Sequence, residues 1–230
     1  MSVSENWRQL QSKARAAAER AGRDPAAVRI LAVSKTFPVD VVRDAYDSGL
    51  RTFGENYVQE ALAKMDALPD DIEWHMIGHL QSNKARQVAG RFALIHSVDS
   101  VHLAAELQKH LGQRNQRQPI LVQINVADED TKSGFSPPEA ANAIAEMSQF
   151  EHLDIRGLMT IGPVEEKPED VRWVFVELRC LQEQLRKRFP DLRLRELSMG
   201  MTGDFEVAIE EGATIVRVGR AVFGERPAKV

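Results

Sequence analysis

The chain has 230 residues and combines 28% charged residues with a formal net charge of only −4. This length is enough for one domain with its own buried core, and two domains are not required. The nearly balanced charge creates no field of one sign that would attract nucleic acid or an anionic membrane, so neither is an expected partner.

The N-terminal segment and the single cysteine point to the cytoplasm. Residues Met1 to Leu10 are polar and include Glu5 and Arg8, so they lack the basic and then apolar regions of a secretory signal. No apolar run approaches the ~20 residues that a membrane-spanning helix needs. Cys180 has no second cysteine with which to form a disulfide, which is typical of a reducing compartment. We therefore expect a soluble cytoplasmic protein.

Short β-branched runs alternate with longer amphipathic stretches from end to end, which is typical of βα units. Before the first strand, Ser4 to Ala21 predicts a helix that could cap the bottom of a barrel. Pro38 opens a predicted helix at Val39–Ser48, because proline is tolerated in the first helical turn. In the same way, a proline pair opens the predicted helix at Glu139–Gln149.

Eight segments are predicted strands, and eight is the number that closes a barrel of this type. They are Val28–Ser34, Arg51–Gly54, Ile72–Ile77, Ala93–Ser97, Ile120–Val126, Ile155–Thr160, Leu194–Ser198 and Thr214–Val218. The pattern predicts a single (β/α)8 TIM-like barrel over residues 1–230, preceded by the extra helix. An open doubly wound sheet would show the same alternation, but eight units and a phosphate-binding pattern near the end of the chain favour the barrel.

The first predicted strand is apolar until it ends at Lys35, on the face where barrel enzymes hold their sites. Most lysines at strand ends are merely solvated. A partly buried amine at the mouth, however, would favour its neutral form, which is the nucleophile that an aldehyde cofactor requires.

Two turns near the end of the chain combine glycines with free backbone N–H groups. Ser198 to Asp204 follows the seventh predicted strand, and Gly219-Arg220 follows the eighth. Barrels frequently bind phosphate after these two strands, and successive amides in a turn favour an anion. Either turn alone could be a tight connection, but their joint position predicts a phosphate site.

Arg217 is a further candidate, because alternation places it opposite Val216 and Val218. If the valines face the helices, Arg217 faces the barrel interior. A buried guanidinium needs a partner, because an unpaired buried charge is costly. That partner is either a carboxylate at a strand end, such as Glu55 or Glu196, or a ring nitrogen of a bound heterocycle.

With these motifs the chain resembles the pyridoxal phosphate homeostasis protein family, whose barrel is similar to the N-terminal domain of alanine racemase. The resemblance covers essentially the whole chain. So many motifs in the same order are highly specific for this family. The motifs are Ala32 to Lys35, Phe53 to Glu60, Trp74 to Lys84, Lys132 to Phe135, Gly157 to Thr160, Leu197 to Thr202 and Val216 to Gly219.

The resemblance implies that pyridoxal 5'-phosphate is held as a Schiff base on Lys35. It also implies that Arg217 meets the pyridine nitrogen and that Asn56 and Met159 flank the ring. By the same resemblance the phosphate is held by Ser198, Gly200 and the amides around Gly219.

Two positions depart from the family pattern. Thr202 stands where serine is usual, which keeps a hydroxyl. Arg220 stands where threonine or serine is more usual, so a hydroxyl that would contact phosphate is lost. At position 220 only the backbone amide is therefore expected to bind, with the guanidinium as an optional contact.

A catalyst is the alternative to a carrier: an amino-acid racemase or another small enzyme that uses pyridoxal phosphate. Racemisation needs a base on each face of the substrate carbanion, and in alanine racemase-like enzymes one base is a tyrosine from a separate β-domain. The chain ends soon after Phe223, and its tyrosines, Tyr46 and Tyr57, fall in predicted helices or at their start. We therefore expect a non-enzymatic role in vitamin B6 homeostasis, with apo-enzymes that use the cofactor as partners.

Two other patterns are interpreted as structural. His75 and His79 have the spacing of the helical zinc motif H-E-x-x-H, but Met76 replaces its glutamate and the context is strand and loop. No metal is therefore expected. The basic run Arg186-Lys187-Arg188 is interpreted as a solvated face that complements the helix dipole.

Overall fold

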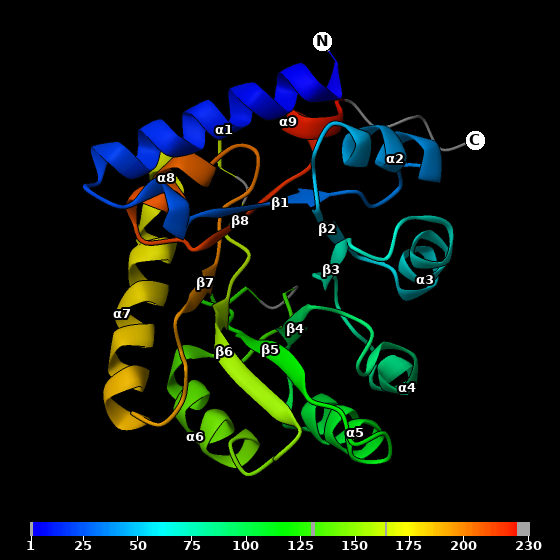
Figure 1. Cartoon of the computed structure of the whole chain (residues 1–230). Helices are drawn as coiled ribbons and strands as arrows, with labels where there is room; N and C mark the ends of the chain where they lie inside the picture. Colours follow the sequence, from blue (N-terminus) through cyan, green and yellow to red (C-terminus); the bar gives the residue numbers. More distant parts are fainter. Residues whose placement is uncertain (1, 130–131, 164, 225–230) are drawn as a thin grey trace.

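The computed structural model describes residues 2–129, 132–163 and 165–224. In it, parallel strands pair in sequence order and close into a barrel, β1 to β8 (Figure 1). Closure is made where β8 pairs with β1, from Arg29 opposite Ile215 to Ala32 opposite Val218. The strands are β1 Arg29–Val33, β2 Thr52–Glu55, β3 Glu73–Met76, β4 Leu94–Val98, β5 Gln118–Gln123, β6 Leu153–Met159, β7 Glu196–Ser198 and β8 Ile215–Val218. The predicted barrel is confirmed.

Helices that follow the strands form an outer ring around the barrel (Figure 1). They are α2 Val39–Asp47, α3 Val58–Ala67, α4 Ala85–Val88, α5 Val101–Gly112, α6 Pro137–Met147, α7 Arg172–Arg188, α8 Phe205–Glu210 and α9 Arg220–Phe223. Three short 3₁₀ turns, η1 Pro25–Ala27, η2 Ser82–Lys84 and η3 Pro168–Val171, complete the connections within the described ranges. Across the part of the chain that the structure describes, no helix is both long and apolar enough to cross a membrane.

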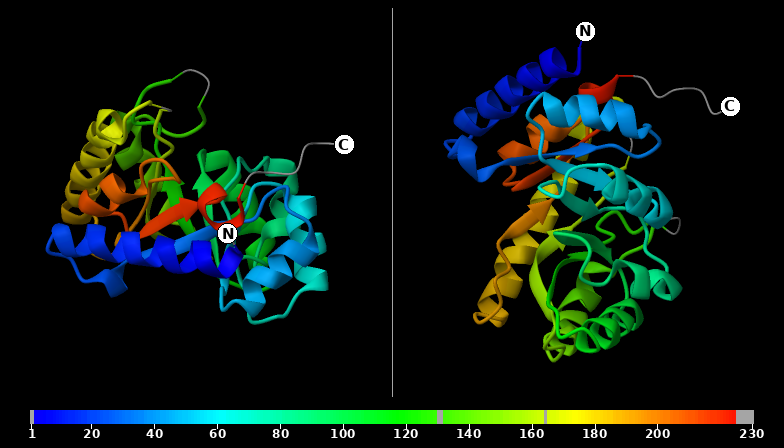
Figure 2. Two further views of the ribbon diagram at one scale, coloured as in Figure 1. Left: turned by 90° about the horizontal axis from the view of Figure 1, so that it is seen from above. Right: turned by 45° about the vertical axis from the view of Figure 1, so that its right-hand side comes forward.

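The extra N-terminal helix, α1 Val3–Arg20, takes a place in this ring and does not cap the barrel bottom. It begins with a capping box in which Ser2 and Glu5 bind each other's backbone amides. It packs against α8, α9 and α2, and both views of Figure 2 show it beside α8 and α9. The reason is that α9 has only four residues, so α1 covers the side of the barrel that α9 leaves open.

Apolar side chains form two layers, one between strands and helices and one inside the barrel. The inner layer consists of Leu31, Val33, Ile77, Leu94, Leu121, Met159 and Ile215. On β8, Val216 and Val218 belong to the outer layer, whereas Ile215 points inward. Arg217 therefore points inward as well, and its side chain is buried. The prediction that Arg217 faces the barrel interior is confirmed.

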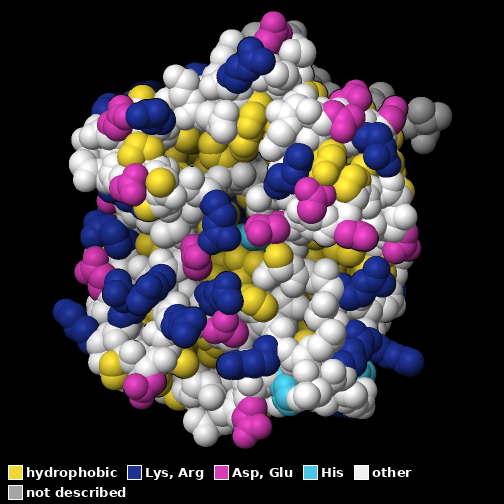
Figure 3. All heavy atoms as spheres, in the orientation of Figure 1, with side chains coloured by type: hydrophobic (Ala, Val, Ile, Leu, Met, Phe, Trp, Pro, Cys, Tyr) yellow, Lys and Arg dark blue, Asp and Glu magenta, His cyan; other side chains and the backbone are white. Residues whose placement is uncertain are grey.

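The visible surface carries both signs of charge. Lysine and arginine side chains lie among aspartate and glutamate side chains over the face shown in Figure 3. This mixture agrees with the small net charge of −4.

Candidate ligand-binding site

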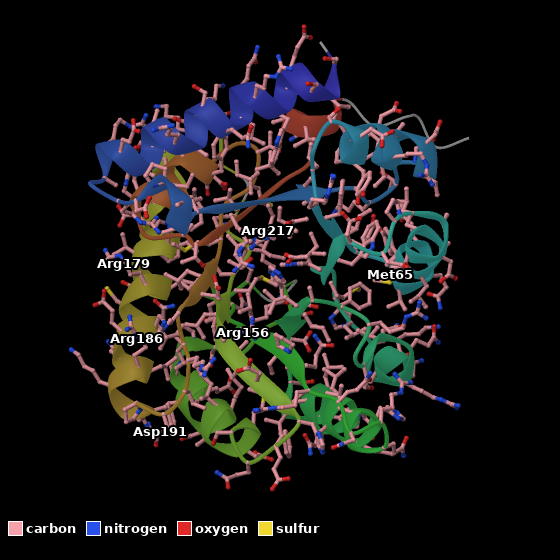
Figure 4. All side chains as sticks on the ribbon, in the orientation of Figure 1. Met65, Arg156, Arg179, Arg186, Asp191 and Arg217 are labelled. Carbon is pink, nitrogen blue, oxygen red and sulfur yellow. The ribbon has the colours of Figure 1, made fainter. Side chains whose placement is uncertain are left out.

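A pocket of about 430 Å³ opens at the barrel mouth, where loops follow the carboxyl ends of the strands. Because all strands are parallel, residues far apart in the sequence meet at this end. Five of the predicted site residues line the pocket: Lys35, Asn56, Arg217, Gly219 and Arg220. Figure 4 shows Arg217 inside the ring of helices, whereas Arg179 and Arg186 extend from α7.

The other three predicted site residues are buried and are not among the described residues that line the pocket. Met159 belongs to the apolar layer inside the barrel. Ser198 is fully buried at the end of β7. Gly200 is buried within the turn that follows β7. Their direct contacts with a ligand therefore stay predictions.

The turn after β7 is shaped by Gly200 and Asp204. Gly200 has φ +90°, and an added Cβ would lie 2.5 Å from the Cβ of Ala208 on α8, so the turn and the helix are in close contact. The carboxylate of Asp204 accepts the Met201 N–H, and the Asp204 N–H donates to the Met201 carbonyl at 3.1 Å. Burial raises the pKa of Asp204, although the Met201 amide and the Arg217 charge oppose this shift.

Four amides around the pocket have no acceptor within the described ranges. They are the backbone N–H groups of Thr202 and Gly203 after β7 and of Gly219 and Arg220 after β8. All four residues line the pocket. Such a group of amides is suited to an anion with several oxygens, such as a phosphate.

Sequence reasoning named the turn from Ser198 to Asp204 but did not assign pocket contacts to Met201, Thr202, Gly203 and Asp204, all of which line it. The wall made by Ile161, Pro163 and Pro168 was also missed. The amide-rich turn itself contained the signal for the first group. The second group lies on a long connection without a periodic pattern, so no sequence signal identified it.

The Arg217 guanidinium is held inside the barrel by hydrogen bonds to two neutral acceptors. Its Nη1 donates to Ser198 Oγ at 2.7 Å and its Nη2 donates to the Thr160 carbonyl at 2.8 Å. Within the described residues it forms no ion pair with Glu55 or Glu196, which instead bind Lys64 and Arg29. Burial lowers the pKa of Arg217 to about 10, so the guanidinium stays charged at neutral pH.

A chain of buried polar groups continues from Arg217 across the barrel. His96 Nδ1 lies 2.8 Å from Ser198 Oγ, and His96 Nε2 lies 2.9 Å from His75 Nδ1. Arginine can only donate, so the Ser198 hydroxyl oxygen accepts the hydrogen bond from Arg217. Ser198 therefore links Arg217 to the pair of buried histidines.

Both histidines are neutral in this chain. Burial lowers the pKa of His75 to about 3 and that of His96 well below its usual value. His75 Nε2 is buried and has no partner in the part of the chain that the structure describes, whereas His79 is exposed and binds Asp99 at 2.8 Å. The two histidines of the zinc-like spacing therefore do not converge, and no cluster of metal-ligating side chains occurs in ranges 2–129, 132–163 and 165–224.

Comparison with known proteins places the chain in a family. The model of the alanine racemase N-terminal domain matches residues 3–227. The pyridoxal phosphate homeostasis protein of Aquifex aeolicus is 45% identical over 227 residues, covering 98% of this chain and 99% of that protein. The chain belongs to the pyridoxal phosphate homeostasis protein family. The Pseudomonas aeruginosa member is 43% identical, covering 97% of this chain and 96% of its own.

Solved structures agree with this assignment. PipY of Synechococcus elongatus, determined with pyridoxal phosphate bound, has a TM-score of 0.85 and 38% identity, covering 96% of this chain and 100% of PipY. Alanine racemase of Clostridium difficile has a TM-score of 0.74 at 15% identity. That second similarity concerns the fold alone, and it spans 98% of this chain but 58% of the racemase.

Proposed function

We propose that this chain binds pyridoxal 5'-phosphate at the barrel mouth as a Schiff base on Lys35, and that it stores and delivers the cofactor for apo-enzymes. The observation that carries the proposal is the meeting of Lys35, Arg217 and four amides in one pocket, the amides having no acceptor among the described residues. The bound cofactor supplies an aldehyde, whose carbon forms a C=N bond with the Lys35 nitrogen as one water leaves. Binding of this cofactor by the relative PipY supports the same assignment.

The residues of the pocket suit the parts of the cofactor. The amides of Thr202, Gly203, Gly219 and Arg220 have no acceptor in the described structure, and a phosphate offers several. Asn56 lines the pocket, and its buried Oδ1 has no partner among the described residues, so this oxygen can accept a hydrogen bond from a hydroxyl group of the ligand. Met159 lies in the apolar layer beneath the mouth.

Arg217 would weaken the cofactor as an electron sink, although this feature alone does not forbid racemisation. As a charged group that can only donate hydrogen bonds, it stabilises an unprotonated ring nitrogen. A pyridine ring whose nitrogen is unprotonated withdraws electrons less strongly from a bound amino acid. Ser198 and the Thr160 carbonyl hold the guanidinium in place, so the barrel itself fixes a positive charge at this position.

The positions of the tyrosines also support a non-enzymatic role. Tyr46 donates its hydroxyl proton to Asp71 at 2.8 Å. Tyr57 is 57% exposed, and neither tyrosine is among the residues that line the pocket. An amino acid bound in this pocket would therefore lack a tyrosine of the same chain positioned on one of its sides. A single positioned acid–base group contributes roughly 10² to 10⁴ in rate.

Borohydride reduction of cofactor-loaded protein, followed by mass mapping of the modified lysine, tests the proposal. We expect modification at Lys35 in the wild type and loss of the trappable chromophore in Lys35→Ala, which keeps some cofactor non-covalently. Lys167 also lines the pocket, so Lys167→Ala is the matched control and should trap normally. Full trapping by Lys35→Ala, or modification that maps to Lys167, would show that the Lys35 assignment is wrong.

A further inference from the structure

Helix α3 carries a lysine that is buried and fully bonded. Lys64 is 2% exposed, and its Nζ donates to the Ser34 carbonyl at 2.7 Å, to Glu55 Oε1 at 2.6 Å and to Glu60 Oε1 at 2.7 Å. These three bonds use all three donors of the ammonium group. Buried ion pairs can often be replaced by apolar residues without loss of stability, so the cluster calls for a reason beyond stability.

The cluster of Lys64, Glu55 and Glu60, called here the α3 cluster, holds the residues on both sides of Lys35. On the N-terminal side of Lys35, the Ser34 hydroxyl donates a hydrogen bond to Glu55 Oε1 at 2.6 Å, and the Ser34 carbonyl accepts one from Lys64. After it, Thr36 donates its backbone N–H to Glu60 Oε1 at 2.6 Å. The backbone around Lys35 is therefore tied to the α3 cluster at two points.

Thr36 adopts a backbone conformation that its side chain disfavours. Its φ is +69°, in the left-handed region where β-branched residues are true outliers. The Phe37 N–H donates to the Ser34 carbonyl at 3.2 Å, which closes a tight turn with Lys35 and Thr36 in the middle. Ser34 thus presents one oxygen to both the turn and Lys64. Strain of this kind persists only when the surroundings hold it in place.

We infer that the α3 cluster positions Lys35 for its bond with the cofactor, by holding the Ser34 to Phe37 turn in its strained form at the pocket wall. The inference rests on the proposed function, because it assigns the covalent bond to Lys35. The amides after β7 and β8 lie on other connections and have no hydrogen bond to the α3 cluster within the described residues. The cluster therefore controls covalent capture, while the phosphate contacts control non-covalent binding.

Glu60 offers the sharpest test, because its side chain is 25% exposed and its loss leaves the Lys64–Glu55 pair intact. Lys64→Met would instead leave the buried Glu55 without its cation, which is strongly destabilising. Glu60→Gln keeps an oxygen that can accept the Thr36 N–H, whereas Glu60→Ala removes it. Gln59→Ala, at the exposed neighbouring position of α3, is the control for the helix.

The experiment measures two equilibria: the borohydride-trappable share of bound cofactor in each variant, and the affinity for cofactor in the Lys35→Ala background. We expect Glu60→Ala to lower the equilibrium constant for covalent capture roughly 5- to 30-fold, the factor that corresponds to the strain at Thr36. Glu60→Gln and Gln59→Ala should stay within about twofold of wild type. In the Lys35→Ala background Glu60→Ala should leave the affinity unchanged.

Failure of the positioning role and failure of the proposed function give different results. If wild type traps fully and Glu60→Ala traps equally well, the positioning role is refuted and the proposed function stands. If Glu60→Ala weakens binding equally with and without Lys35, the α3 cluster is only structural. If wild type forms no trappable bond to Lys35, the proposed function fails and the positioning role falls with it.

Discussion

Gly200 is the position where the turn after β7 tolerates least change. Its φ is +90°, and an added Cβ would lie 2.5 Å from Ala208 Cβ and 3.1 Å from the Phe205 Cα. A left-handed conformation costs a non-glycine residue roughly 1–2 kcal/mol, and overpacking adds typically 1–3 kcal/mol. We therefore expect Gly200→Ala to lower the free energy of unfolding by about 2–5 kcal/mol, a large part of the stability of an ordinary domain.

Gly203 is the matched control in the same turn. Among the described residues nothing lies within 4 Å of a Cβ added there, and its φ is outside the left-handed region. Gly203→Ala should therefore change the free energy of unfolding by no more than about 0.5 kcal/mol. Urea unfolding of the cofactor-free proteins measures both values, and thermal unfolding should show a fall in Tm of roughly 4–20 °C for Gly200→Ala.

Cofactor affinity provides a second readout for Gly200→Ala. The Gly200 carbonyl accepts the Arg217 N–H at 3.0 Å, so a displaced turn moves away from β8 and carries the Thr202 and Gly203 amides with it. Weaker binding of the phosphate group should accompany the loss of stability. Equal stability of the two alanine variants would refute the account of this turn.

Three further predictions concern the network below the pocket and the function. Arg217→Met should keep part of the cofactor binding and change the visible spectrum, because the ring nitrogen loses its charged neighbour; an unchanged spectrum with marked instability would make Arg217 purely structural. His75 and His96 have lowered pKa values, so the unfolded chain binds more protons below about pH 6.5. Stability measured by urea unfolding should therefore fall by roughly 1–3 kcal/mol per pH unit as the pH drops from about 6.5 toward 4, and a His75→Gln/His96→Gln variant should lose this slope. Finally, α-hydrogen exchange of alanine and serine in deuterated water should stay near the free-cofactor rate, and a turnover of about 1 s⁻¹ or more would favour the enzyme.

The sequence alone determined the architecture and much of the site. Hydrophobic periodicity is a local property, so eight βα units and their order could be counted along the chain. Parallel strands bring their carboxyl ends together, which placed Lys35, the turn after β7 and Gly219 at one mouth. Alternation along β8 placed Arg217 on the face opposite Val216 and Val218. These conclusions need no knowledge of which distant side chains touch.

Only the tertiary structure decided which groups bind each other inside the barrel. Ser198 meets His96, which is 102 positions away, and Arg217 meets the Thr160 carbonyl, which is 57 positions away. Alternation specifies the face of a residue but not its partner, so Glu55 and Glu196 remained open as partners of Arg217 until their bonds to Lys64 and Arg29 were seen. The placement of α1 was likewise decided by packing, because the shortness of α9 left one side of the barrel for it to cover.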